Sequence, residues 1–203
     1  MRNLNLSDVQ INNSVMSYNG FSKIYNYNLD INKFSGKRMH GVERECVIKP
    51  YVAGILPYDS KRDQIVLIEQ FRVGALADKH SPWLLELVAG IVDKEGESVA
   101  KMAERELAEE TALTTNKLNF IMEYWVSPGA STEQLSLYWA DVDSSKAGKI
   151  CGVLAEQEDI KVHILSSDEA FDLMDKGLIA NSLTIIGLQW LKLNREEIKK
   201  KVV

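Results

Sequence analysis

The sequence lacks the features of small secreted proteins and of membrane proteins. Only two cysteines occur among its 203 residues. Cys46 and Cys151 lie far apart and match no metal-binding spacing, so two reduced thiols are favoured over a disulfide. No apolar run is long enough to cross a bilayer, and the polar segment 1–17 has no apolar core of the kind found in signal peptides. These absences predict a cytoplasmic protein that does not enter membranes.

Positive charge is scarce as well. The 24 Lys and Arg residues are outnumbered by 29 Asp and Glu residues, which gives a formal net charge of −5. No basic cluster lies inside the chain, and residues 199–201 are expected to be a solvated helix end, so nucleic-acid binding is disfavoured. An acidic chain that acts on an anionic substrate needs a cation to bridge the two.

The composition that remains is that of a globular protein with a core, with 45% hydrophobic and 26% charged residues. Apolar periodicity and turn residues predict six strands and three helices in the main part of the chain. The strands are expected at residues 51–56, 64–71, 83–88, 118–126, 134–142 and 159–165, and the helices at 98–111, 167–176 and 182–200. Because these elements mix without regular βαβ alternation, they predict an α/β/α sandwich of the α+β class on a mixed sheet.

Two further segments stand apart from this pattern. In residues 1–47, alternating apolar positions predict two or three short strands, a small antiparallel β region in front of a main domain at 48–203. The loop at about residues 143–158 contains serines, glycines and the acidic string that begins at Glu156. Loops of this length inside a compact domain are often functional, so this one could be a lid that brings acidic side chains to a site.

The most informative stretch is an acidic helix. Glu106, Glu109 and Glu110 are spaced by three and four residues, which places them on one helix face. Like charges four residues apart destabilise a helix by about 0.2–0.5 kcal/mol per pair. Magnesium ions prefer oxygen ligands and take one or two carboxylates together with water and substrate phosphate. In an arbitrary Glu-rich helix a solvated acidic face is the better interpretation, but here the flanking residues favour a metal site.

These flanking residues resemble the Nudix box, the pattern G-x5-E-x7-R-E-U-x-E-E-x-G-U, in which U is a bulky apolar residue. The positions that match from the first glutamate onward are Glu97, Arg105, Glu106, Leu107, Glu109, Glu110 and Leu113. Two positions depart from the pattern. Six residues instead of five lie between Gly90 and Glu97, and Ala112 replaces a glycine, so the loop before the helix and its C-cap are expected to differ.

Nearly the whole chain, most clearly from about residue 50 to 195, resembles the bacterial ADP-ribose pyrophosphatase family. The resemblance implies metal ions, two or three Mg²⁺ with Mn²⁺ as an alternative. Their ligands would be the carbonyl of Ala89 and the carboxylates of Glu106, Glu110 and Glu158. The catalytic residues would be Glu156, as general base, and Glu109, as a ligand or beside the ligands. Structural roles in the motif would belong to Gly90, to Arg105, which orients the carboxylates, and to Glu97, which is tied to Arg105.

The resemblance also implies substrate contacts from two subunits of a homodimer that exchange their N-terminal strands. Arg72 and Glu133 match positions that face the nucleotide-sugar, whereas Arg44 and Phe21 match positions supplied by the second subunit. Arginine suits phosphate because its planar fork makes bidentate bonds, and an aromatic ring such as that of Phe21 can stack on adenine. The alternatives are that Arg72 pairs with a surface carboxylate and that Phe21 is buried in the core.

The expected activity is the Mg²⁺-dependent hydrolysis of the diphosphate of a nucleotide-sugar, with ADP-ribose cleaved to AMP and ribose 5-phosphate. One alternative is a Nudix hydrolase that acts on GDP-mannose, ADP-glucose or another nucleoside diphosphate derivative, because specificity depends on pockets outside the box. The other is a sensor that binds a nucleotide metabolite without cleaving it. The sensor is disfavoured because every acidic position of the box is filled and no DNA-binding module fits.

Overall fold

The computed structural model describes residues 4–202 except positions 79, 93 and 95. The chain divides into two compact units, and each is described by itself below. The first unit comprises Met1–Tyr51 and Trp125–Gln134, and the second comprises Val52–Tyr124 and Leu135–Val203. The first unit therefore includes the connection between two strands of the large sheet in addition to the N-terminal segment.

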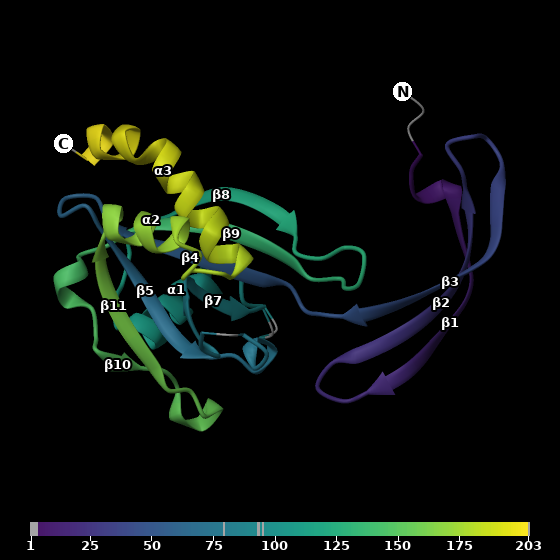
Figure 1. Ribbon diagram of the computed structural model, residues 1–203, viewed down its shortest axis with the longest axis horizontal. Helices are drawn as coiled ribbons and strands as arrows, with labels where there is room; N and C mark the ends of the chain where they lie inside the picture. The colour runs from purple at the N-terminus through teal and green to yellow at the C-terminus, as the bar shows by residue number, and fades with distance from the viewer. Residues whose placement is uncertain (1–3, 79, 93, 95, 203) are drawn as a thin grey trace. The chain divides into compact units, whose positions relative to one another are not determined.

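The first unit is built on three antiparallel strands in the order β1-β2-β3 (Figure 1). The strands are β1 (Val9–Asn19), β2 (Lys23–Asn32) and β3 (Arg38–Ile48), preceded by the short 3-10 helix η1 (Leu6–Asp8). Residues 125–134 attach to the end of β3, where Val47 and Ser131 form a parallel bridge. Every residue of β1 is exposed, and none of the described residues of this unit belongs to the buried hydrophobic core.

The second unit contains a mixed sheet in the order β10-β11-β5-β4-β9-β8, with β6 paired to β5 and β7 paired to β4. Its strands are β4 (Val52–Asp59), β5 (Gln64–Phe71), β6 (Trp83–Glu86), β7 (Val88–Ile91), β8 (Leu118–Trp125), β9 (Gln134–Asp141), β10 (Ile150–Cys151) and β11 (Ile160–Ser166). β4 runs parallel to β9 and antiparallel to β5 and β7. The sheet is therefore mixed, as the sequence predicts.

Helices cover both faces of this sheet, with α1 behind it in Figure 1 and α2 and α3 in front of it. The helices are α1 (Val99–Thr111), α2 (Ser167–Asp175) and α3 (Ser182–Val202). Met102 and Leu107 of α1 form one core cluster with Val66 and Ile68 of β5. On the other face Gly54 leaves room for Leu183 of α3, because a Cβ at position 54 would lie 2.6 Å from that side chain. The predicted α/β/α sandwich is confirmed.

Three expectations about the elements need correction. The single strand expected at 83–88 is two strands, because the chain pairs with β5 up to Glu86, in β6, and with β4 from Val88 on, in β7. The amide of Leu87, between them, donates a hydrogen bond to Thr184 of α3 at 2.9 Å. The N-terminal strands are ten or eleven residues long rather than short. The helix end at 199–201 is not simply solvated, since Lys199 Nζ lies 2.7 Å from a carboxylate oxygen of Asp63.

Segment 143–158 also contains more structure than a plain loop. It holds the 3-10 helices η3 (Ser144–Lys146) and η4 (Leu154–Glu156) and the short strand β10. No helix among the described residues combines the length and the apolar character that a membrane span requires.

Candidate active site

The acidic stretch forms α1, as its sequence predicts. The Ser98 side chain caps the helix by accepting a hydrogen bond from the amide of Lys101. At the other end Ala112, with φ of +60°, adopts the left-handed conformation that usually belongs to glycine, and its amide bonds to the carbonyl of Ala108. The substitution in the box thus keeps the C-cap geometry, although a side chain at positive φ is strained. The extra residue of the preceding loop falls where positions 93 and 95 lie outside the described residues.

Arg105 gathers the carboxylates that flank it on α1. Its guanidinium lies 2.7 Å from Glu106 and 2.8 Å from Glu109, and 3.3 Å from Glu97 in the loop before the helix. The bond to Glu97 is the strongest of the contacts that raise the pKa of Arg105 above its already high value. Arg105 therefore stays charged and holds these three carboxylates in place.

Gly90 lets strand β7 approach the helix closely. A Cβ at position 90 would lie 2.3 Å from both Cγ and Cδ of Glu106, which no real pair of carbon atoms tolerates. The glycine of the box is therefore required by the position of the Glu106 side chain, not by its backbone conformation. This contact sets where the carboxylate of Glu106 can lie.

Glu110 is the most deeply buried of these glutamates, with 2% of its surface exposed. Its Oε2 accepts a hydrogen bond of 3.3 Å from the amide of Ala89. Burial, followed by the charge of Glu106, raises the pKa of Glu110 well above its ordinary value, and burial also raises the pKa of Glu106. Among the described residues no basic side chain forms an ion pair with Glu110.

A bound cation fits this environment, because a buried carboxylate that no basic side chain pairs directly is costly unless a metal compensates it. The side-chain positions do not form a complete cation site, since within the described residues no three His, Cys, Asp or Glu side chains form a ready metal-binding group. Glu106 faces Arg105, and Glu110 faces the amide of Ala89. The carboxylate oxygens are donors of the kind that Mg²⁺ or Mn²⁺ prefers.

Segment 143–158 is attached to the C-terminal end of α1. The amides of Gly148 and Gly152 donate to the carbonyls of Thr111 and Glu109, at 2.8 and 3.1 Å. Gly152 has φ of +105°, a backbone conformation that favours glycine, and a Cβ there would lie 2.9 Å from the Cβ of Glu158. If this segment acts as a lid, these bonds limit its movement to the part beyond Gly152.

The two glutamates of this segment differ in their surroundings. Glu158 accepts a hydrogen bond of 3.0 Å from the amide of Val153, and its charge acts on both Glu106 and Glu110. Glu156, at the end of η4, is exposed; its amide donates to the carbonyl of Val153, but its carboxylate makes no hydrogen bond or ion pair with another described residue. Glu158 thus belongs to the acidic cluster. Glu156 lies two positions earlier in the sequence, and its carboxylate does not bond to this cluster among the described residues.

Arg72 follows β5 and faces the same cluster. Its Nε and Nη2 atoms bond to one carboxylate oxygen of Glu86 at 2.9 and 2.8 Å. Although burial alone would lower the pKa of Arg72, the bonds and charge of Glu86, together with the charges of Glu110 and Glu158, raise it. The partner is not the surface carboxylate of the alternative interpretation, because Glu86 is only 8% exposed.

Glu86 is a residue of the site that the sequence does not single out. The available signal was a single charged residue inside the apolar run that begins at Trp83. Such a residue in a strand needs a partner, but only the pairing of β5 with β6 shows that the partner is Arg72.

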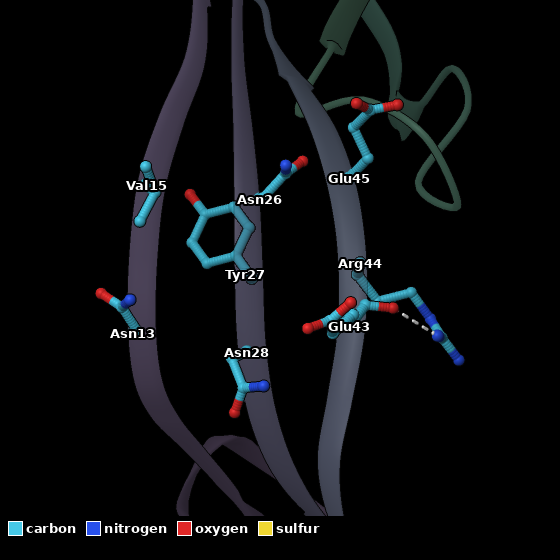
Figure 2. Close-up of a pocket in the computed structure, with 8 residues that line it drawn as sticks. All are labelled: Asn13, Val15, Asn26, Tyr27, Asn28, Glu43, Arg44 and Glu45. Carbon is cyan, nitrogen blue, oxygen red and sulfur yellow. Dashed lines mark hydrogen bonds between the residues drawn. The ribbon is translucent and has the colours of Figure 1, made fainter.

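The other three expected substrate residues belong to the first unit. Phe21 is 96% exposed, so the alternative that it lies in the core is wrong. Arg44, on β3, bonds to the carbonyl of Glu43 at 2.7 Å and lines a polar hollow of about 490 Å³ (Figure 2). Glu133 lies in the connection to β9, where its carbonyl accepts a bond from the amide of Val126. The hollow is lined by Asn13, Val15, Asn26, Tyr27, Asn28, Glu43, Arg44 and Glu45.

Comparison with known proteins identifies the family of the chain. A family model described as NUDIX domain matches residues 49–182. The ADP-ribose pyrophosphatase of Escherichia coli (strain K12) is 37% identical over 195 residues, which cover 96% of this chain and 93% of that protein. The ADP-ribose pyrophosphatase of Haemophilus influenzae is 38% identical over 196 residues, which cover 95% and 90% of the two chains.

More distant similarity is found to one curated protein and to one solved structure. A GDP-mannose pyrophosphatase of Escherichia coli O1:K1 / APEC is 30% identical over 186 residues, which cover 91% of this chain and 94% of that protein. A crystal structure of an ADP compounds hydrolase superposes with a TM-score of 0.69 at 23% identity, covering 94% of this chain and 97% of that one. At this identity the structural likeness supports the fold alone.

Proposed function

Because this chain belongs to the Nudix family, we propose that it is a hydrolase that cleaves the diphosphate of ADP-ribose, giving AMP and ribose 5-phosphate. The observation that carries the proposal is the group of carboxylates of Glu106, Glu110 and Glu158, which act on one another electrostatically next to the guanidinium of Arg72. Such a group suits a cation and an anionic substrate together. The relatives that are 37–38% identical over most of the chain favour ADP-ribose among nucleotide-sugars.

The proposed cation is Mg²⁺, with Mn²⁺ as an alternative and two or three ions per site. Its ligands would be the carboxylates of Glu106, Glu110 and Glu158 and the carbonyl of Ala89, with Glu109 beside them. When bound, the cation would offset the charge of the diphosphate and favour attack by water at phosphorus. Arg105 would keep the carboxylates oriented through its bonds to Glu106 and Glu109.

Proton transfer is assigned to Glu156. An exposed carboxylate on a short 3-10 helix next to Glu158 has no competing partner among the described residues. A general base positioned in this way typically contributes about 10²–10⁴-fold to the rate. The part of the segment beyond Gly152 would bring Glu156 to the water molecule when substrate binds.

Substrate-binding roles are assigned to four residues and involve two copies of the chain. Arg72 would bind phosphate and Glu133 would face the nucleotide-sugar, while Arg44 and Phe21 would act on the site of a partner copy. The exposed sheet of the first unit supports a homodimer, since a three-stranded sheet without a buried face is not stable alone. The apolar side chains exposed on β1 are Val9, Ile11, Val15, Met16 and Tyr18. The proposed compartment is the cytoplasm.

The test is hydrolysis of a substrate panel by the purified protein with Mg²⁺ or with EDTA. The panel contains ADP-ribose, ADP-glucose, GDP-mannose, NADH and a diadenosine polyphosphate, and initial rates are compared. We expect ADP-ribose to have the highest kcat/KM, with no turnover in EDTA. Glu106→Gln should abolish turnover, and the matched control Glu104→Gln, an exposed position on the same helix, should not.

The other outcomes distinguish the competing functions. A higher kcat/KM for GDP-mannose would support the activity named for the relative at 30% identity and would require new roles for Arg72, Glu133 and Phe21. Binding of ADP-ribose without turnover of any compound would support the sensor instead.

A further inference from the structure

The ion pair of Arg72 and Glu86 has an unusual geometry. Nε and Nη2 of the guanidinium both donate to the same oxygen, Oε2 of Glu86. The remaining nitrogen, Nη1, has no hydrogen-bond partner in the part of the chain that the structure describes. The side chain of Glu86 is nearly buried, with 10% of its surface exposed, whereas that of Arg72 is 44% exposed. Glu86 therefore holds one edge of the guanidinium, and the other edge is available to a ligand.

The strand register directs this pair toward α1. Glu86 lies opposite Ile68 in the pairing of β5 with β6, and Ile68 packs in the core cluster that contains Leu107 of α1. Alternation along β5 puts Gln70 and Arg72 on the same face as Ile68. The backbone of Arg72 is fixed as well, because its amide donates to the carbonyl of Pro82 at 2.8 Å. Both ends of the arginine are thus held by β6 and by the residue just before it.

Without Glu86 the guanidinium would have other acceptors. The charges of Glu110 and Glu158 act on Arg72, and both belong to the proposed cation site. A guanidinium released from Glu86 would move toward these carboxylates, since opposite charges at short range attract. In that position it would no longer present Nη1 to a phosphate.

We propose that Glu86 is a positioning residue that holds Arg72 through Nε and Nη2, so that Nη1 is free to bind the diphosphate of the substrate. This inference rests on the proposed function. It assigns to Glu86 no contact with the substrate and no role in proton transfer. Its effect should therefore appear in substrate binding and should depend on the presence of Arg72.

The test compares Glu86→Gln, Arg72→Gln and the double variant in steady-state hydrolysis of ADP-ribose. Glu86→Gln should raise KM about tenfold, the scale of one lost charge-assisted hydrogen bond, and change kcat less than about threefold. In the Arg72→Gln background the same change should have little further effect. Calorimetric titration of ADP-ribose in EDTA, where no turnover occurs, should show the same loss of affinity.

Glu69→Gln is the matched control. Glu69 lies on the same strand β5, but its carboxylate pairs with His163 at 2.8 Å and points to the opposite face, so its KM should stay near that of the wild type. If Glu86→Gln does not fold, Glu86→Asp, which keeps the charge but withdraws it by one methylene, should raise KM to a smaller extent. An unchanged KM, or an equal rise with and without Arg72, would overturn the inference. Failure of the wild type to hydrolyse ADP-ribose would instead remove the proposed function.

Discussion

The side chain of Glu106 lies directly against the Cα of Gly90, at a distance that leaves no room for a methyl group. Gly90→Ala should therefore displace the Glu106 carboxylate. Because the obstructing atoms belong to a flexible side chain, the loss of stability should be about 1 kcal/mol, the low end of the range for overpacking. We expect kcat/KM for ADP-ribose to fall by about 100-fold, since misplacement of a ligand by about 1 Å has an effect of this size.

Two measurements separate displacement of Glu106 from damage to the fold. Thermal unfolding of Gly90→Ala in EDTA should remain within a few degrees of the wild type, and Mn²⁺ binding measured by electron paramagnetic resonance should weaken. Wild-type activity in this variant would show that the site tolerates a shifted Glu106.

Glu110→Gln should separate function from stability. Glu110 is buried, and burial together with the charge of Glu106 disfavours its ionised form. The amide of glutamine removes this unfavourable charge, so the metal-free protein should become more stable by roughly 1 kcal/mol. Activity should be lost, because a proposed cation ligand is gone. Urea denaturation in EDTA at pH 7 measures the first effect. A less stable variant would mean that the glutamate has a structural role.

Much of the site could be predicted from sequence because the box is a local pattern. Helical periodicity alone places Glu106, Glu109 and Glu110 on one face of α1, and the structure contains that helix within one residue of the expected bounds. The partner of Arg105 in the preceding loop, Glu97, is also close in sequence. These relationships depend on spacing along the chain and require no knowledge of strand pairing.

Relationships that depend on pairing or packing could not be predicted in this way. The apolar run from Trp83 has no turn residue, so nothing local shows that the strand partner changes at Leu87 or that this residue bonds Thr184, almost one hundred positions later. Glu86 and Arg72 are joined only through the register of β5 and β6. β1 is longer than predicted. All its residues are exposed, so its sequence has no clear alternation of buried and exposed side chains from which the length could be predicted.

Ala112→Gly should stabilise the protein. Ala112 has φ of +60°, where an L-residue with a Cβ is strained by roughly 1–2 kcal/mol. After the greater entropy of glycine in the unfolded chain is included, the net gain should be about 1 kcal/mol, or 2–4 °C in Tm. The matched control is Ala108→Gly, an exposed position inside α1, where the same change should lower stability by about 1 kcal/mol. Loss of stability in both variants would contradict the strain at Ala112.

Asp59 should make stability depend on acidic pH. It is 1% exposed and accepts bonds from Arg62 and Ser144. Burial alone would raise its pKa, but these bonds outweigh it and lower the pKa to about 2, from 3.8. A lowered pKa contributes stability above pH 4, about 2 kcal/mol here, that is lost as the pH falls toward 2. Asp59→Asn should therefore be less stable at pH 7, and urea denaturation at several pH values should show the difference shrinking below pH 4. A difference independent of pH would exclude the charge as its cause.

Removing the charge of Glu156 and removing that of Glu158 should have different effects on kcat and on Mn²⁺ binding. Glu156 is exposed and its carboxylate has no partner among the described residues, so Glu156→Gln should leave Tm and Mn²⁺ binding unchanged. If it is the general base, kcat should fall about 100-fold or more. Glu158 bonds the amide of Val153 and acts on the buried pair of Glu106 and Glu110, so Glu158→Gln should instead weaken Mn²⁺ binding. If Glu156→Gln keeps turnover within a fewfold of the wild type, the proton must go elsewhere. Glu109 would then be the next residue to test, and its variant would need a Tm control because it also pairs with Arg105.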